Sequence, residues 1–375
     1  MTTDEQLRQR LADDLEAGGY LRTRPWREAV ETVPRHQFLR GGYFEQIPDS
    51  VPTAWRPALP DTPGWLERCY ADASLVTQIA GTIVPTDIRG EIMRTPTSSS
   101  TMPNLVVRML EDLQVEDDQR VLEIGTGTGY SIALMCHRLG DGRVTSVEVD
   151  QEVSARARTA LGGCGYFPNL VVGDGLAGCK DGAAYGRVVA TCGVLDVPRP
   201  WIEQTRPGGV VLATVCGWLY ASELARLTVA EDGTARGRFL GGYISFMLAR
   251  PQLPPALGML PDLDDGDERP AQLGVDVLDD WTARFVAQIA APRAQLISLP
   301  RDDRTEHVLI DVTGEAWAAL WQDGERWMVR QGGPVRIWDA IEDLLARWRA
   351  DGAPALDRFE IAVTPDGQTV TWPSS

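Results

Sequence analysis

The stretch VLEIGTGTGY at residues 121–130 places an apolar run directly before three glycines and a helix-length segment. Glycine permits positive φ and lets the backbone approach a ligand closely, and free N–H groups at the start of a helix can receive a carboxylate. A single loop of this kind is equally compatible with a tight turn that binds nothing. The stretch therefore predicts a strand, a sharp turn and a helix, and the rest of the chain must decide its function.

The order of strand and helix recurs on the C-terminal side of this stretch. Apolar runs rich in β-branched residues alternate with helix-length segments, the runs lying at residues 121–124, 144–149, 170–172, 188–190 and 210–215. This alternation is typical of an α/β protein with a doubly wound, mainly parallel sheet. We therefore expect a Rossmann-like fold for this part of the chain.

Two acidic residues after later strands indicate which ligand the glycine loop binds. The spacing of the loop is GxGxG, whereas dinucleotide-binding folds carry GxGxxG, so a nicotinamide cofactor is the less natural ligand. Glu148 ends the next strand, where its carboxylate can accept both hydroxyls of a ribose. Asp174, in GDG at 173–175, can meet an adenine amino group, although a simple Asp-Gly turn is the alternative. Together the three elements favour a bound adenosyl group.

Composition excludes several classes of partner. The chain has 375 residues and a formal net charge of -17, which disfavours nucleic acid because phosphate binding draws on clustered Lys and Arg. No apolar run is long enough to span a bilayer, and the acidic N-terminus lacks a secretory signal, so we expect no membrane partner and a cytoplasmic location. The six cysteines form no CxxC pair and the three histidines are isolated, so we expect no metal site.

Length and composition predict more than one domain. Apolar spacing over residues 4–32 predicts two short helices, and the many prolines between residues 48 and 63 predict a long surface loop. We expect N-terminal helices and a proline-rich insertion at 1–95, a ligand-binding core at 96–250, a linker at 251–272 and a C-terminal α+β domain at 273–375. Seven of the twelve tryptophans lie in the last 95 residues: Trp281, Trp317, Trp321, Trp327, Trp338, Trp348 and Trp372.

Seven segments together resemble protein L-isoaspartate O-methyltransferases in order and approximate spacing, over about residues 25–220. They are VPRHQF (33–38), SSSTMPNLVVRML (98–110), VLEIGTGTGY (121–130), VTSVEVD (144–150), GYFPNLVVGDG (165–175), AAYGRVVATCGVLDVP (183–198) and QTRPGGVVLATV (204–215). The resemblance implies a class I methyltransferase fold, S-adenosylmethionine as cofactor and S-adenosylhomocysteine as product. It also implies a set of cofactor-binding residues: Glu123, Gly125, Thr126, Gly127, Gly129 and Tyr130 for the methionine part, Glu148 and Val149 for the ribose side, and Asp174 and Gly175 for the adenine.

The resemblance also places the methyl acceptor. A Ser or Thr two residues before a Pro lies beside the accepting carboxylate in this family, and the position here is Thr101, with Ser99 and Ser100 adding hydroxyls. The alternative role of Thr101 is to cap the helix that starts at Pro103. A carboxylate is already ionised at neutral pH, so methyl transfer to it needs no strong general base, and we assign no role to any histidine.

Three features depart from the family. Gly186 stands where the family usually carries Asp, a proline-rich insertion precedes Thr101, and about 140 residues follow the expected sheet. We expect the first two changes to lie close to the acceptor side. Extended relatives that resemble this chain methylate an aspartate in a cyclised ribosomal peptide and so form an aspartimide. We expect such a macrocyclised precursor peptide as substrate, contacted by the C-terminal tryptophans. The alternatives are general isoaspartate repair, a small-molecule methyltransferase and a non-catalytic peptide-binding protein, and the oligomeric state stays open.

Overall fold

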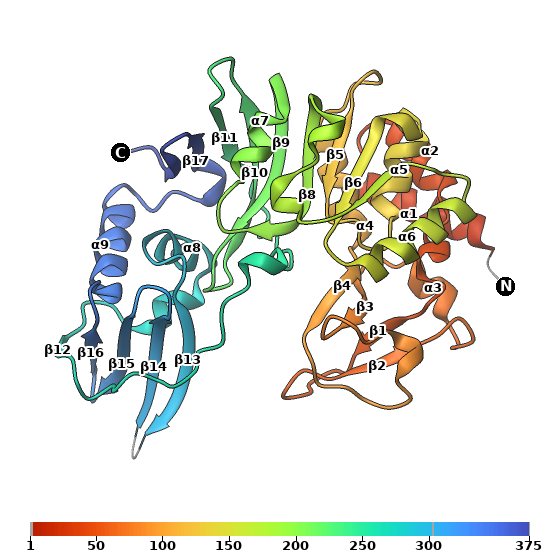
Figure 1. Cartoon of the computed structure of the whole chain (residues 1–375). Coiled ribbons are helices and arrows are strands. Elements are labelled where there is room, and N and C mark those ends of the chain that lie inside the picture. The colour runs from red at the N-terminus through yellow and green to blue at the C-terminus, as the bar shows by residue number, and fades with distance from the viewer. Residues whose placement is uncertain (1–2, 302–303, 375) are drawn as a thin grey trace. The chain divides into compact units, whose positions relative to one another are not determined.

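The computed structural model describes residues 3–301 and 304–374. The chain divides into two compact units (Figure 1): residues 1–191 with 200–212, and residues 192–199 with 213–375. No helix among the described residues is long and apolar enough to cross a membrane. The predicted α/β class with an additional C-terminal sheet domain is confirmed.

The first unit contains the predicted parallel sheet. Strands β5 (Val121–Ile124), β6 (Val144–Glu148) and β7 (Asn169–Val172) pair in parallel, and β8 (Tyr185–Val194) pairs in parallel with β5. The order β8-β5-β6-β7 puts β5 inside the sheet. Helices α5 (Tyr130–Leu139) and α6 (Gln151–Gly163) pack against β6. Because the strands are parallel, the loops after β5, β6 and β7 meet at one edge of the sheet, where ligands bind in open α/β folds.

The N-terminal region contains the two predicted helices, α1 (Asp4–Ala17) and α2 (Arg24–Thr32). The proline-rich region, in contrast, does not form the structureless loop that we expected. Its strands β1 (Tyr43–Gln46), β2 (Trp55–Ala58), β3 (Leu75–Ile79) and β4 (Pro96–Ser100) form an antiparallel sheet in the order β2-β1-β3-β4, and α3 (Trp65–Cys69) lies between β2 and β3 in the chain. Pro57 is tolerated because β2 is an edge strand. We call this four-stranded sheet the insert sheet.

The capping role expected for Thr101 is wrong. Helix α4 (Pro103–Asp112) takes Met102 as its N-cap, without a side-chain cap from that residue. The Asp72 carboxylate instead accepts from the Asn104 N–H at 2.9 Å, and the Ser74 hydroxyl accepts from the Met102 N–H at 3.1 Å. The first turn of α4 is therefore satisfied by residues about 30 positions earlier, and the Thr101 hydroxyl is not used for capping.

The second unit is built on antiparallel strands. Strands β10 (Ser222–Val229), β11 (Ala235–Phe239), β17 (Glu360–Thr364) and β18 (Gly367–Thr371) are neighbours in that order. A five-stranded sheet has the order β12-β16-β15-β14-β13, with helices α8 (Trp281–Ala290) and α9 (Ile337–Ala350) packed together beside it (Figure 1). Its strands are β12 (Asp267–Pro270), β13 (Gln295–Arg301), β14 (Arg304–Asp311), β15 (Ala316–Asp323) and β16 (Arg326–Gly332). Strand β9 (Thr205–Cys216) and helix α7 (Arg199–Glu203) contribute residues to both units.

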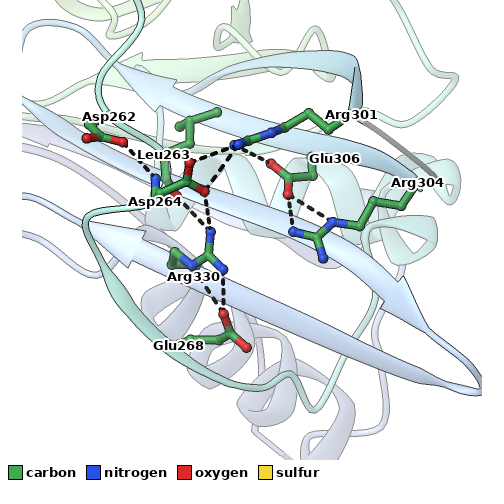
Figure 2. A network of polar contacts seen from close by, with 8 residues as sticks. All are labelled: Asp262, Leu263, Asp264, Glu268, Arg301, Arg304, Glu306 and Arg330. Atoms are coloured by element: carbon green, nitrogen blue, oxygen red, sulfur yellow. Dashed lines mark hydrogen bonds and ion pairs between the residues drawn. The ribbon is translucent and has the colours of Figure 1, made fainter.

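Residues 251–272, which we expected to be a linker, contain an ordered part. The segment provides strand β12, and Leu263 is buried in a cluster with Val308 and Trp317. Figure 2 shows how ion pairs hold it: Asp264 pairs with Arg301 and Arg330, and Glu268 also pairs with Arg330. Glu306, whose side chain is 0% exposed, pairs with Arg301 and Arg304 in the same network. The segment therefore forms part of the second unit.

Only three of the seven C-terminal tryptophans, which we expected to form a contact surface, are partly exposed. Trp317, Trp321, Trp338 and Trp348 are buried. The other three are half-buried, and each packs against a ring: Trp281 against Tyr243, Trp327 against His307, and Trp372 against Phe359. Large aromatic side chains contribute their apolar area to a core more often than to a surface. The tryptophans therefore explain the stability of the second unit and give no support to peptide recognition.

Candidate cofactor and acceptor site

The glycine loop between β5 and α5 has the conformation that its sequence predicts. Gly125, Gly127 and Gly129 have φ values of 95°, 54° and 91°. A Cβ on Gly125 would lie 2.7 Å from the Thr191 Oγ1, and a Cβ on Gly127 would lie 3.4 Å from the Ser99 carbonyl oxygen. Thr191 also donates to the Gly125 carbonyl at 2.6 Å, a contact that the sequence analysis missed. Both the backbone angles and the close neighbours therefore require glycine here.

Glu148 ends β6 directly beside this loop. One carboxylate oxygen accepts from the Gly127 N–H at 3.0 Å, and the other accepts from the Asp150 N–H at 3.1 Å. A carboxylate has about four lone-pair positions, so each oxygen keeps one for a further donor. Glu148 is thus fixed in orientation and can still accept from a pair of vicinal hydroxyls, as a ribose would offer.

Apolar and acidic groups extend the site along the edge of the sheet. Val149, after β6, is 42% exposed, and Val172, at the end of β7, is 51% exposed. The Gly173 N–H donates to the Glu148 carbonyl at 2.9 Å, which brings the two strand ends together. Exposed aliphatic side chains beside a carboxylate that can accept ribose hydroxyls provide a surface on which a purine ring can lie. The residues present therefore fit an adenosyl group.

Asp174 forms the Asp-Gly turn that we gave as the alternative, but the turn engages only one of its carboxylate oxygens. Its Oδ1 accepts from the Leu176 N–H at 2.9 Å, and its other oxygen accepts no hydrogen bond from a described residue. Gly175 follows, and a Cβ there would lie 2.5 Å from the Ile124 side chain. The Asp-Gly pair thus forms a tight turn against β5 and leaves one carboxylate oxygen for an exocyclic amine.

The side chains of Glu123, Thr126 and Tyr130, in and beside the loop, are buried. The Glu123 side chain is 0% exposed, and its two oxygens accept from the Ser131 and Ser146 hydroxyls. Thr126 joins this network through a 2.8 Å contact with the Ser146 hydroxyl, and Tyr130 is buried at the start of α5. A fully buried side chain has no surface to offer a ligand. The expectation that the Glu123 side chain holds the cofactor is therefore corrected: it supports the loop from within.

Burial gives Glu123 a testable property, because it raises the pKa of this carboxyl from 4.5 to about 8. A raised folded-state pKa means that the folded protein keeps a proton which the unfolded chain releases above about pH 4.5. The contribution of Glu123 to stability is then complete below pH 4.5 and declines as the pH rises to about 8. Glutamine does not titrate, so Glu123→Gln lacks this decline. We expect its free energy of unfolding to rise relative to that of the wild type by up to about 1.4 kcal/mol per pH unit between pH 5 and pH 8.

Urea unfolding of both proteins at pH 5, 6, 7 and 8 measures this difference. The Ser131 and Ser146 hydroxyls can rotate to meet the amide, so the variant should fold. A difference that stays constant over this range would contradict the neutral state assigned to Glu123.

The acceptor segment predicted from sequence lies against the glycine loop. Ser99 and Ser100 belong to β4, and the carbonyl of Ser99 is the group that approaches Gly127. Ser100 is buried, and its hydroxyl has no hydrogen-bond partner among the described residues. The Thr101 hydroxyl likewise makes no hydrogen bond to a described residue. The segment Ser99–Thr101 therefore carries hydroxyl groups and packs directly against the glycine loop.

Arg35, which the sequence analysis overlooked, holds this segment in place. Its side chain is 0% exposed and donates to the carbonyls of Ser100 and Thr101 at 3.3 and 3.1 Å. It also donates to three carbonyls at and after the end of α3, those of Cys69, Ala71 and Ala73, at 2.9 to 3.0 Å. Burial lowers the pKa of this guanidinium from its ordinary value, and no described carboxylate pairs with it. The available signal was a charged side chain inside the motif VPRHQF, which the family resemblance had already singled out.

Gly186 lies away from this site, in contrast to our expectation that it lies on the acceptor side. It is near the start of β8, where its N–H donates to the Arg120 carbonyl at 3.0 Å just ahead of β5. The glycine loop follows the opposite end of β5. Gly186 is therefore no sign of an altered acceptor site or of lost activity.

A mainly parallel sheet, a glycine loop after β5 and a carboxylate ending β6 define the class as a Rossmann-like methyltransferase. The family model described as Protein-L-isoaspartate(D-aspartate) O-methyltransferase matches residues 77–239. The protein-L-isoaspartate O-methyltransferase of Methanopyrus kandleri is 34% identical over 238 residues, 63% of this chain and 88% of the relative. That of Methanothermobacter thermautotrophicus is 29% identical over 237 residues, 63% of this chain and 91% of the relative. The chain belongs to the protein-L-isoaspartate O-methyltransferase family and is an S-adenosylmethionine-dependent enzyme.

A solved structure also bears on the C-terminal part. A protein named protein-L-isoaspartate O-methyltransferase matches with a TM-score of 0.56 and 20% identity, over 97% of this chain and 99% of that chain. The similarity in fold therefore extends over the residues that we expected to be an addition to the family. The length of this chain does not by itself separate it from proteins of that name.

Proposed function

We propose that the chain methylates the free carboxylate of an L-isoaspartyl residue in a peptide, bound at the segment Ser99–Thr101. The observation that carries this proposal is the approach of the Ser99 carbonyl to Gly127, at 3.4 Å from the position of a Cβ. It brings the hydroxyl-bearing segment to the loop that would hold the methionine part of the cofactor. An acceptor on the hydroxyls is then adjacent to the methyl donor.

Methyl transfer to a carboxylate depends mainly on the alignment of the carboxylate oxygen with the methyl group. When bound, S-adenosylmethionine would supply a sulfonium methyl group for transfer to a carboxylate oxygen, the O–C bond forming as the S–C bond breaks, with S-adenosylhomocysteine as the leaving group. The acceptor carboxylate is ionised at neutral pH and needs no base, so the residues act by orienting it and excluding water. The Thr101 hydroxyl donates to the carboxylate, while Arg35 fixes the backbone that carries it. The resulting ester has a better leaving group, so the neighbouring backbone amide nitrogen can close a succinimide.

A second candidate substrate is an aspartate side chain in a macrocyclised ribosomal peptide, which would become an aspartimide. One observation favours it: the acceptor strand β4 is part of the insert sheet, so the 58 residues from the start of β1 at Tyr43 to the end of β4 at Ser100 are available to form a dedicated peptide site. The tryptophans, Gly186 and the length of the chain no longer favour it. We therefore place L-isoaspartyl peptides first.

A comparison of two acceptors separates the candidates. The enzyme is incubated with labelled S-adenosylmethionine and either a linear L-isoaspartyl peptide or a pre-cyclised aspartyl peptide. We expect base-labile label on the isoaspartyl peptide, with a kcat/KM at least about tenfold higher than on the cyclised one, equal to about 1.4 kcal/mol. Efficient methylation of the cyclised peptide alone would reverse the order of the two candidates.

A further inference from the structure

A chain of hydrogen bonds connects the acceptor strand to the ribose-binding carboxylate. The Thr97 hydroxyl on β4 donates to the Gln78 Oε1 at 2.9 Å, and the Gln78 Nε2 donates to the Asp150 Oδ2 at 3.1 Å. The Asp150 N–H in turn donates to Glu148 at 3.1 Å. We call the side chains of Thr97, Gln78 and Asp150 the relay. No residue of the relay belongs to the glycine loop or to the acceptor segment Ser99–Thr101.

The relay is the second connection between β4 and the cofactor site. Glu148 accepts from the Gly127 N–H at 3.0 Å, and Gly127 lies against the Ser99 carbonyl, two residues after Thr97. Strand β4 is therefore connected to the cofactor site at two points, directly at Ser99 and through the relay at Thr97. The packing of Ser99 against Gly127 and the hydrogen bonds of the relay together limit movement of β4 relative to Glu148, because both must be lost before the strand can shift freely.

The burial of Gln78 and the irregular strand pairing around it explain why its side chain reaches Asp150. Its side chain is 1% exposed, so an amide there must have both its donor and its acceptor satisfied. The pairing of β3 with β4 is irregular on both sides of Gln78, with register shifts between Val76 and Gln78 and between Gln78 and Ile79. Irregularities of this type re-aim a side chain and are frequent beside active sites. Here the side chain reaches Asp150, which also caps α6 through its Oδ1.

We infer that Gln78 is a positioning residue that couples cofactor binding at Glu148 to the order of the acceptor strand. The inference rests on the proposed function, because it takes Glu148 as the ribose ligand and β4 as the acceptor strand. A ligand that fixes the Glu148 carboxylate also fixes Asp150, Gln78 and Thr97, so the acceptor strand becomes more ordered when the cofactor is bound. Coupling of this kind is reciprocal, so an acceptor on β4 also favours the cofactor.

Hydrogen exchange with and without saturating S-adenosylhomocysteine tests this coupling without requiring an acceptor peptide. In the wild type we expect slower exchange in the glycine loop, residues 125–129, and about fivefold slower exchange in residues 96–101. In Thr97→Val and Gln78→Leu the protection of 125–129 should remain, and that of 96–101 should fall below about twofold. Calorimetry should show S-adenosylhomocysteine affinities within about threefold of the wild type, because Glu148 keeps both N–H donors.

Thr77→Val is the matched control, because it removes a threonine hydroxyl that donates from β3 to Ser98 on β4 at 3.5 Å but lies outside the relay. It should retain the protection of 96–101. If Gln78→Leu fails to fold, Thr97→Val decides the test. Protection of 96–101 that persists in Thr97→Val, or that is absent in the wild type while 125–129 is protected, would overturn the inference alone. Absence of protection at 125–129 in the wild type would instead refute the cofactor site, and the inference with it.

Discussion

Arg35→Lys should lower the rate of methyl transfer about 100-fold while leaving the protein folded. A lysine keeps the positive charge but has a single nitrogen, which cannot reach five carbonyls on two segments of the chain. The carbonyls of Ser100 and Thr101 would lose their common donor, so the acceptor segment would shift relative to the glycine loop. Displacements of about 1 Å in an aligned site cost this order of rate. A discontinuous assay with labelled S-adenosylmethionine and an isoaspartyl peptide measures the change.

Two controls isolate the positioning effect of Arg35. The affinity for S-adenosylhomocysteine should stay close to that of the wild type, because the described hydrogen bonds of Arg35 go to the acceptor side and to the residues after α3. Arg24→Lys makes the same change at an exposed helix position and should have full activity. A folded Arg35→Lys enzyme with an unchanged kcat would remove Arg35 from the account.

Thr101→Val should lower kcat/KM for the peptide roughly 10- to 100-fold. The change keeps the shape of the side chain and removes the hydroxyl that would donate to the acceptor carboxylate, a bond to a charged group that is worth about 1.5 to 3 kcal/mol. Because the hydroxyl makes no hydrogen bond to a described residue and does not cap α4, the loss should fall on catalysis and not on stability. Steady-state kinetics together with thermal unfolding separate the two effects.

Thr95→Val provides the matched control for Thr101, because it makes the same substitution at an exposed position just before β4. It should behave as the wild type in both measurements. Equal kinetics for Thr101→Val and Thr95→Val would show that the Thr101 hydroxyl does not contact the acceptor, and would move attention to the unpartnered hydroxyl of Ser100.

The parallel sheet and the glycine loop could be predicted because their signals are local. The apolar runs at 121–124, 144–149 and 170–172 coincide with β5, β6 and β7, and the glycines at 125, 127 and 129 adopt the positive φ that their spacing indicates. Glu148 could be placed for the same reason, since the end of a parallel strand meets the neighbouring loop. These elements contain the glycine loop and Glu148, whose geometry the sequence predicted and whose binding of the cofactor stays a prediction.

The insert sheet and the role of Arg35 could not be predicted, because both depend on contacts between distant parts of the chain. Pairing of β3 with β4 joins residues about 20 positions apart, and β2 forms inside a stretch whose prolines argue against strands. Arg35 unites residues 69–73 with residues 100–101, and no local pattern shows which carbonyls a buried arginine will find. The cap on α4 failed as a prediction for the same reason, since Asp72 lies far from Asn104 in sequence.

The burial of the C-terminal tryptophans could not be predicted, for a different reason. Their concentration in the last 95 residues is a property of composition, and composition does not distinguish a core from a surface. The structure buries four of them and packs the others against neighbouring rings. The second unit is thus accounted for by packing and by the ion pairs in Figure 2.

The central claim is transfer of a methyl group to a peptide carboxylate, and one measurement tests it most directly. A linear L-isoaspartyl peptide and the same peptide with its isoaspartyl α-carboxyl converted to an amide are incubated with the enzyme and S-adenosylmethionine, and the products are analysed by mass spectrometry. The account predicts a gain of one methyl group on the carboxylate peptide, lost again on mild base treatment, and no gain on the amide. A base-stable methyl group, or methylation of both peptides alike, would contradict it.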